Sequence, residues 1–108
     1  LALEHPVSRN REICVTNKLF TYLLAGIPFT ATDTSGQRPI VDDLPRAARS
    51  YRPGDVDGFA DAVRALLEDD GAGDAALAAA RDRYTWDVEN ERFLGVVRDT
   101  LLQRTPAA

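Results

Sequence analysis

The segment from Thr16 to Pro28 restricts the fold more than any other part of the chain, because it marks both ends of a short helix. Thr16 is a typical N-cap residue, whose side-chain oxygen can accept a hydrogen bond from an amide of the first turn. Gly26 suits the left-handed residue that follows a helix, and Pro28 prevents the helix from continuing. We therefore expect a short helix between Thr16 and Gly26.

Lys18 lies in the first turn of this helix, where the helix already carries partial positive charge. A cation is favourable there when an anion binds, because free amides and the ammonium group then point at the same ligand. Lys18 is also the single lysine among 13 basic residues, and a compact ammonium acts as a point charge on phosphate. The pattern favours an anion site, and the alternative is a lysine that extends into water.

Composition excludes several classes of function. The chain begins at Leu1 and contains no methionine among its 108 residues, so we expect a fragment of a longer protein. A net charge of −4 argues against a nucleic acid partner, although basic residues gather between Arg9 and Lys18. One cysteine and one histidine exclude an internal disulfide, a cysteine-rich metal site and most zinc or Ser-His-Asp designs. This usage fits a reducing cytoplasm, so we expect a cytoplasmic protein without a metal. No run of residues is apolar enough to span a membrane.

The rest of the sequence alternates strand and helix signals. The helix after Asp55 is the clearest, because its apolar residues recur at helical spacing on one face. We expect Asp55 and Asp74 to cap helices, and Trp86 to pack the last helix onto a sheet. The expected elements are the end of a strand at 1–3, an irregular polar segment at 4–14, strands at 29–33 and 48–51, a turn at 34–37, a short helix at 39–43, and helices from 55, 74 and 85 onward.

This order of elements predicts an α/β fold: a partial Rossmann-like domain with parallel strands, flanking helices and a helical C-terminal end. Two or three short strands are too few for a doubly wound sheet, so we expect the missing strands before Leu1. A strand edge and an apolar face would then be exposed, which predicts dye binding or aggregation of the isolated chain.

Sheets of this kind bind ligands at the carboxyl ends of their strands. Glu4 follows the first expected strand, and the turn that contains Ser35, Gly36 and Gln37 follows the second. The loop with Asn10 and Arg11, and the helix start with Asn17 and Lys18, lie between them in sequence. We expect these four groups to converge on one crevice.

Four segments resemble, in the same order, motifs of the GT4 family of glycosyltransferases (glycosyl transferases group 1), which have the two-domain GT-B fold. Asn17–Pro28 is similar to the family's NKLFEYLAAGLP segment, and Phe29–Thr34 to the strand after it. Tyr51–Asp55 resembles the later PPGD segment, and Tyr84–Asp87 resembles the YSWE near the end. The resemblance implies that residues 1–108 are a C-terminal fragment of the nucleotide-sugar-binding domain, without the N-terminal acceptor domain.

The resemblance further implies transfer of a sugar from a nucleotide diphosphate sugar to an acceptor, usually with retention and without a metal or other cofactor. The departing diphosphate gathers negative charge as the glycosidic bond breaks, so basic side chains and helix-start amides stabilise it. Lys18 takes this catalytic role, and Arg9 is a weaker candidate than Arg11. We expect an isolated fragment to be inactive, with any peripheral membrane association made by the missing part. The expected donor-binding residues are Arg11, Asn17, Lys18, Thr21, Ser35, Gly36 and Gln37.

One position departs from the family pattern. Many members have glutamate where this chain has Thr21, and a second acid eight residues earlier, where this chain has Ile13. The glutamate normally accepts hydrogen bonds from ribose hydroxyls, whereas the hydroxyl of Thr21 brings no charge. Glu4 could supply a carboxylate from the strand end and is the second expected catalytic residue; Glu12 is expected to be a solvated loop residue.

Two other functions stay open: a nucleotide-sugar epimerase of the same architecture, and a non-catalytic α/β binding module in which Thr21 marks a lost site. His5 could serve as the base of an inverting enzyme, but a loop histidine without a partner is usually incidental. Cys14 is expected to pack as a small apolar residue. The acidic pairs at 42–43 and 69–70 are expected to be solvated turns rather than metal ligands.

Overall fold

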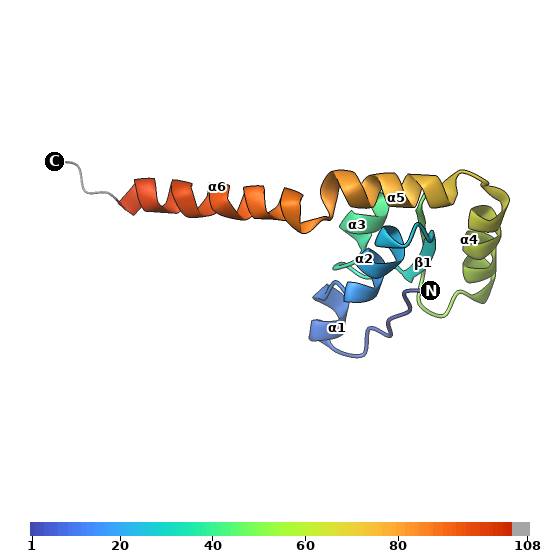
Figure 1. The fold of residues 1–108 in the computed structure, drawn as a ribbon. Helices are drawn as coiled ribbons and strands as arrows, with labels where there is room; N and C mark the ends of the chain where they lie inside the picture. The colour runs from blue at the N-terminus through green and yellow to red at the C-terminus, as the bar shows by residue number, and fades with distance from the viewer. Residues whose placement is uncertain (105–108) are drawn as a thin grey trace.

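The computed structural model describes residues 1–104, along which helices and short strands alternate (Figure 1). The molecule is mixed α/β, with a small parallel sheet and flanking helices, as the sequence predicts. The elements are α1 (Arg9–Ile13), α2 (Asn17–Leu24), β1 (Phe29–Thr32), α3 (Arg38–Asp42), β2 (Ala48–Tyr51), α4 (Val56–Glu68), α5 (Ala72–Arg83) and α6 (Trp86–Arg104).

Parallel pairing joins three parts of the backbone. β1 and β2 pair along their whole length, starting with Phe29 opposite Ala48. On the other edge of β1, Ala2 forms a parallel bridge with Ala31, and the amide of Ala2 donates to the carbonyl of Thr30 at 2.8 Å. The strands predicted at 29–33 and 48–51 are confirmed, whereas the one expected at 1–3 is reduced to this single bridge.

α2 is the helix that the sequence marks at both ends. Gly26 has a φ of 69°, the left-handed conformation that glycine adopts at little cost after a helix. The amide of Ile27 donates back to the carbonyl of Tyr22 at 2.9 Å, which satisfies one of the free carbonyls of the last turn. Leu19 and Leu23 recur four residues apart and are fully buried, so one side of α2 faces the core.

The core lies where α2 meets β1 and α5. Phe29 is buried beside the leucines of α2, with the small residues Ala76 and Ala80 of α5 in the same cluster, and buried residues of α3 and β2 extend it. Small side chains allow close approach of the two helices: a Cβ at Gly73 would lie only 2.9 Å from the carbonyl oxygen of Gly26. The alanine-rich stretch of the sequence therefore serves as a close-packed helix face.

α4 covers the sheet from the other side, so that Figure 1 shows the strands between α2 and α4. Asp55 caps this helix, because its side-chain oxygen accepts a hydrogen bond from the amide of Gly58 at 2.9 Å. The rings of Phe59 and Tyr51 meet edge to face with centroids 5.2 Å apart, which fastens the start of α4 to the end of β2. The predicted capping role of Asp55 is confirmed.

Two expectations about helix starts are wrong. The segment at 4–14 was expected to be irregular but contains α1, which Ser8 caps by accepting the amide of Arg11 at 3.3 Å. α5 begins at Ala72, after Gly71, so Asp74 lies in the first turn instead of capping it. The carboxylate of Asp69 accepts a hydrogen bond from the amide of Gly71 at 2.9 Å. The turn formed in this way starts α5 before Asp74.

α6 extends away from the rest of the molecule (Figure 1) and has no buried residue in the described part of the chain. Trp86 is 71% exposed, so the expectation that it packs the last helix onto the sheet is wrong. Trp86, Phe93 and Val97 still recur at helical spacing, and their side chains are exposed. Among residues 1–104, none of the helices combines the length and the apolar character needed to cross a membrane.

An ion pair joins the loop after α3 to the loop between α4 and α5. The guanidinium of Arg46 donates two hydrogen bonds to the carboxylate of Asp69, one of them at 3.0 Å. The pKa of Asp69 lies below its usual value mainly because of these hydrogen bonds from Arg46. The next cause is a hydrogen bond that Asp69 accepts from the amide of Gly71. The acidic pair at 69–70 lies at the surface, as expected, and Asp69 in addition makes this ion pair.

We expect this ion pair to be visible in the pH dependence of stability. Because the folded pKa of Asp69 is depressed, its contribution is complete above the ordinary value of about 3.9 and is lost as the pH falls through the lower folded pKa. Asp69→Asn should lower the melting temperature at neutral pH, and its deficit relative to wild type should shrink on acidification. Asp70→Asn is the matched control. An Asp69→Asn deficit that stays constant with pH would contradict the assignment.

Candidate functional site

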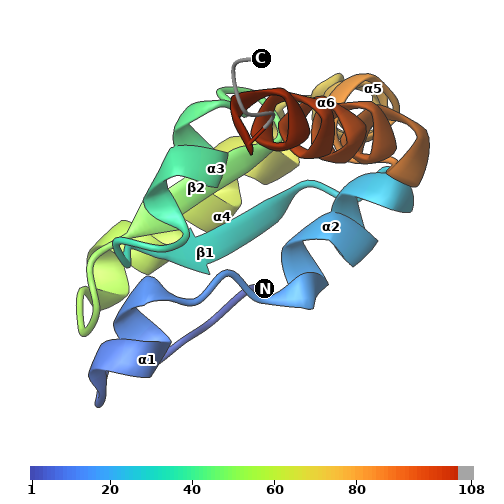
Figure 2. The same ribbon diagram turned by 90° about the vertical axis from the view of Figure 1, so that its left-hand side faces the viewer.

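The carboxyl ends of the parallel segments lie along one edge of the sheet, where α1 meets the loop that leaves β1 (Figure 2). The amide of Glu4 donates to the hydroxyl of Thr32 at 2.9 Å, and that hydroxyl lies 3.2 Å from the hydroxyl of Tyr51. Hydrogen bonds thus link the ends of all three segments. The predicted edge is present, and it carries several of the residues singled out from the sequence.

Glu12 holds the loop after β1 against α1. Its carboxylate accepts the amide of Ser35 at 2.9 Å, and its backbone carbonyl accepts the Ser35 hydroxyl at 3.1 Å and the amide of Gly36 at 2.9 Å. The expectation that Glu12 is a solvated loop residue is wrong. Sequence reasoning missed this contact because α1 was not expected, and no local signal links a helix to a loop more than twenty residues later.

Gly36 permits the close approach of the two backbones. A Cβ at this position would lie 2.3 Å from the carbonyl oxygen of Ile13 and 2.5 Å from that of Cys14. Both atoms belong to the main chain, so no side-chain rotation relieves the clash. Gly36 therefore serves contact between α1 and the loop, and its amide and that of Ser35 are already used inside the protein.

The start of α2 keeps free hydrogen-bond donors. Within residues 1–104, the amides of Asn17 and Lys18 donate to no group, and the ammonium group of Lys18 has no ion pair. Both side chains are exposed. Thr16 occupies the N-cap position without making the expected cap hydrogen bond, and its buried hydroxyl has no partner in the described residues.

Two predicted donor-binding residues use their side chains internally. The hydroxyl of Thr21 donates to the carbonyl of Asn17 at 3.2 Å, one turn earlier in α2. Gln37 is fully buried, and its side-chain amide donates to the carbonyl of Thr32 at 3.0 Å. The expectation that Gln37 meets a donor sugar through its side chain is therefore wrong: it closes the turn at the end of β1.

The remaining predicted residues lie around the same edge without direct contact to one another. Glu4 is half-buried next to the bridge, and Arg11 is exposed on α1. No hydrogen bond or ion pair in the described residues joins Lys18 to Glu4 or Arg11. The structure thus brings Ser35 and Gly36 into contact with Glu12 of α1, the residue that follows Arg11 in sequence. Lys18 is a separate cation at the start of α2, without an ion pair in the described residues.

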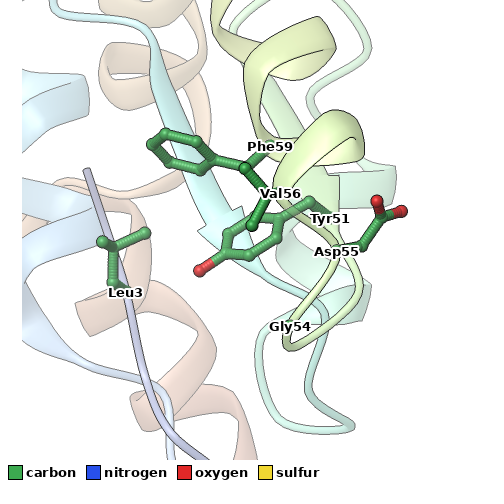
Figure 3. A pocket seen from close by; sticks show the side chains of 6 residues that line it. All are labelled: Leu3, Tyr51, Gly54, Asp55, Val56 and Phe59. Carbon is green, nitrogen blue, oxygen red and sulfur yellow. The ribbon is translucent and has the colours of Figure 1, made fainter.

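An apolar hollow of about 300 Å³ also opens near this edge, between the bridge and the start of α4 (Figure 3). Tyr51 and Phe59 form its aromatic wall, and Leu3 faces them. Sequence reasoning did not single out this hollow, although the turn at 53–55 that precedes α4 marked its position. Its lining offers apolar contact rather than catalytic groups.

No group of three or more metal-ligating side chains occurs in residues 1–104. Comparisons with protein-family models, with curated proteins and with solved structures gave no match to this chain.

We expect Gly36→Ala to destabilise the folded protein by about 1–3 kcal/mol, the usual cost of forcing extra atoms into a packed site. The added methyl group must displace α1 from the loop, because both clashing atoms are backbone oxygens. Urea unfolding followed by circular dichroism measures the change.

Gly95→Ala is the matched control, since nothing lies within 4 Å of a Cβ at that position. Gly95 is in the interior of α6, so alanine should stabilise the helix slightly. Equal stability of the Gly36→Ala variant and wild type would show that α1 and the loop do not meet as described.

Proposed function

We propose that the chain belongs to the donor-binding domain of a GT-B glycosyltransferase and forms part of a Rossmann-like sheet. The observation that carries the proposal is the start of α2, where the amides of Asn17 and Lys18 donate to no group and Lys18 is exposed and has no ion pair in residues 1–104. Amides and a point charge on one helix start suit the diphosphate of a nucleotide sugar. The parallel sheet supports the proposal, because it directs that helix start to the edge where such folds bind ligands.

The proposed reaction breaks the bond between the sugar and the diphosphate and forms a new bond to an acceptor. Negative charge grows on the leaving diphosphate, and donors that are already in place stabilise it without rearrangement. In the proposal Lys18 neutralises this charge, the amide group of Asn17 adds a neutral hydrogen bond, and Arg11 supplies a second cation from α1. Glu4 is the carboxylate at the strand end.

Two exposed apolar surfaces are consistent with a larger protein. Leu1 and Leu3 flank the bridge at the open edge of the sheet and are 55% and 43% exposed. α6 leaves Trp86 and Phe93 in solvent as well. In the proposal, further strands cover the first surface, and a second, acceptor-binding domain completes the cleft. The proposed enzyme is cytoplasmic.

A second candidate is a non-catalytic binding module. It is favoured by Thr21, whose hydroxyl is bonded to its own helix at 3.2 Å. The position where related sequences are expected to carry a ribose-binding carboxylate therefore offers neither charge nor a free hydroxyl proton. In this candidate Thr21 marks a lost nucleotide site, and the protein lacks turnover.

We expect Lys18→Ala to weaken UDP binding about tenfold or more, because hydrogen bonds to charged groups contribute roughly 1.5–3 kcal/mol. Isothermal titration calorimetry of the purified protein with UDP and with GDP measures the loss. Arg81→Ala removes an exposed cation from α5 and should leave the affinity unchanged.

The outcomes separate the candidates. Equal affinity of wild type and Lys18→Ala, or no nucleotide binding by wild type, rejects the proposed site. Lysine-dependent binding together with hydrolysis or transfer from a nucleotide sugar supports the glycosyltransferase. Measured on a protein that also carries the proposed acceptor domain, absence of nucleotide diphosphate binding supports the module, and conversion of the donor sugar without an acceptor supports an epimerase.

A further inference from the structure

α1 is attached to the molecule mainly through polar contacts. It has five residues, and none of them is buried. An isolated helix of this length is unstable in water, so contacts to the rest of the protein must hold it. Among its residues, Glu12 makes three hydrogen bonds to the loop after β1: one through its carboxylate and two through its carbonyl.

The loop that Glu12 holds is itself firmly anchored. Thr34 and Gln37 are fully buried, and the amide of Gln37 donates to the hydroxyl of Thr34 at 3.3 Å. Arg38 pairs with Asp33 at 2.8 Å across the same turn. The loop therefore provides a fixed partner, and α1 is the part whose position depends on the contact.

α1 carries Arg11, the second cation of the proposed diphosphate site, directly before Glu12. We propose that Glu12 is a positioning residue: its hydrogen bonds to Ser35 and Gly36 hold α1 on the end of β1 and thereby place Arg11 for the diphosphate that Lys18 binds. The identity of the ligand in this inference rests on the proposed function. The attachment of α1 to the loop after β1 rests on the geometry alone. If α1 were detached from the loop, the segment with Arg11 would have to become ordered when the ligand binds. This ordering would lower the affinity.

The attachment can be measured without a ligand, by hydrogen exchange of individual backbone amides. In wild type the amides of Ser35 and Gly36 are both hydrogen-bonded to Glu12 and should be protected. Glu12→Ala removes only the hydrogen bond to the Ser35 amide, because the carbonyl that accepts from the Ser35 hydroxyl and the Gly36 amide remains. Exchange of both amides should rise about tenfold or more if α1 detaches. A rise at Ser35 alone would show that the carboxylate does not hold α1, and would overturn the inference.

The role in placing Arg11 is tested by a double-mutant cycle on UDP affinity. Glu12→Ala should weaken binding about threefold or more, a coupling typical of residues in one network. Glu12→Gln should restore it, because an amide oxygen can accept the same hydrogen bond from Ser35. In an Arg11→Ala background, Glu12→Ala should have no further effect.

Each alternative result is distinct. Additive losses in the cycle, or a Glu12→Gln variant as weak as Glu12→Ala, overturn the positioning role. Glu91→Ala is the matched control, since Glu91 is exposed on α6, and it should match wild type in both assays. If wild type binds no UDP, the proposed function fails and the placement of Arg11 for a diphosphate fails with it. Hydrogen exchange then still decides whether Glu12 holds α1.

Discussion

Parallel pairing determines where the other elements begin and end. Parallel strands cannot be joined by a tight turn, so each connection must cross back over the sheet, and here α2 and α3 make the two crossings. A crossing helix starts at the edge where the preceding strand ends. The start of α2, the segment with α1 and the loop after β1 therefore belong to one edge of the sheet, even though more than thirty residues separate Glu4 from Gln37 in sequence.

Different forces stabilise the two ends of this arrangement. Beneath the sheet, Leu19, Leu23 and Phe29 are fully buried against the small residues of α5, and apolar burial dominates. At the carboxyl edge, the contacts are hydrogen bonds that the Thr32 hydroxyl and the Glu12 carboxylate accept from backbone amides. Polar contacts of this kind contribute less each but are directional. The core thus fixes α2 as a whole, whereas the hydrogen bonds fix the segments that surround its free first turn.

The sequence predicted the elements whose signals are local. Gly26 and Pro28 marked the end of α2, and Asp55 marked the start of α4. The strand at 29–32 was placed from a short apolar run before a turn, and the strand at 48–51, which is not an apolar run, from its place before the turn at 53–55. The contact of Glu12 with the loop was missed, since α1 is short and its partner is distant in sequence. The exposure of Trp86 was also missed, because an apolar stripe shows that a helix has a face to cover and does not show what covers it.

The candidate site was predicted in part for the same reason. Lys18 and Asn17 could be placed from the helix signal, and both are exposed at the helix start. Gln37 could not, because its burial depends on the turn that follows β1 and on the carbonyl of Thr32. A polar residue in a loop looks the same in sequence whether it faces a ligand or closes the loop from within.

The central claim is that the first turn of α2 binds a diphosphate through its free amides and Lys18. Titration of the ¹⁵N-labelled protein with UDP, followed by amide chemical shifts, tests it most directly. The account predicts that the amides of Asn17 and Lys18 shift most and saturate together. Saturating shifts confined to other parts of the chain, or no shifts at all, would contradict it.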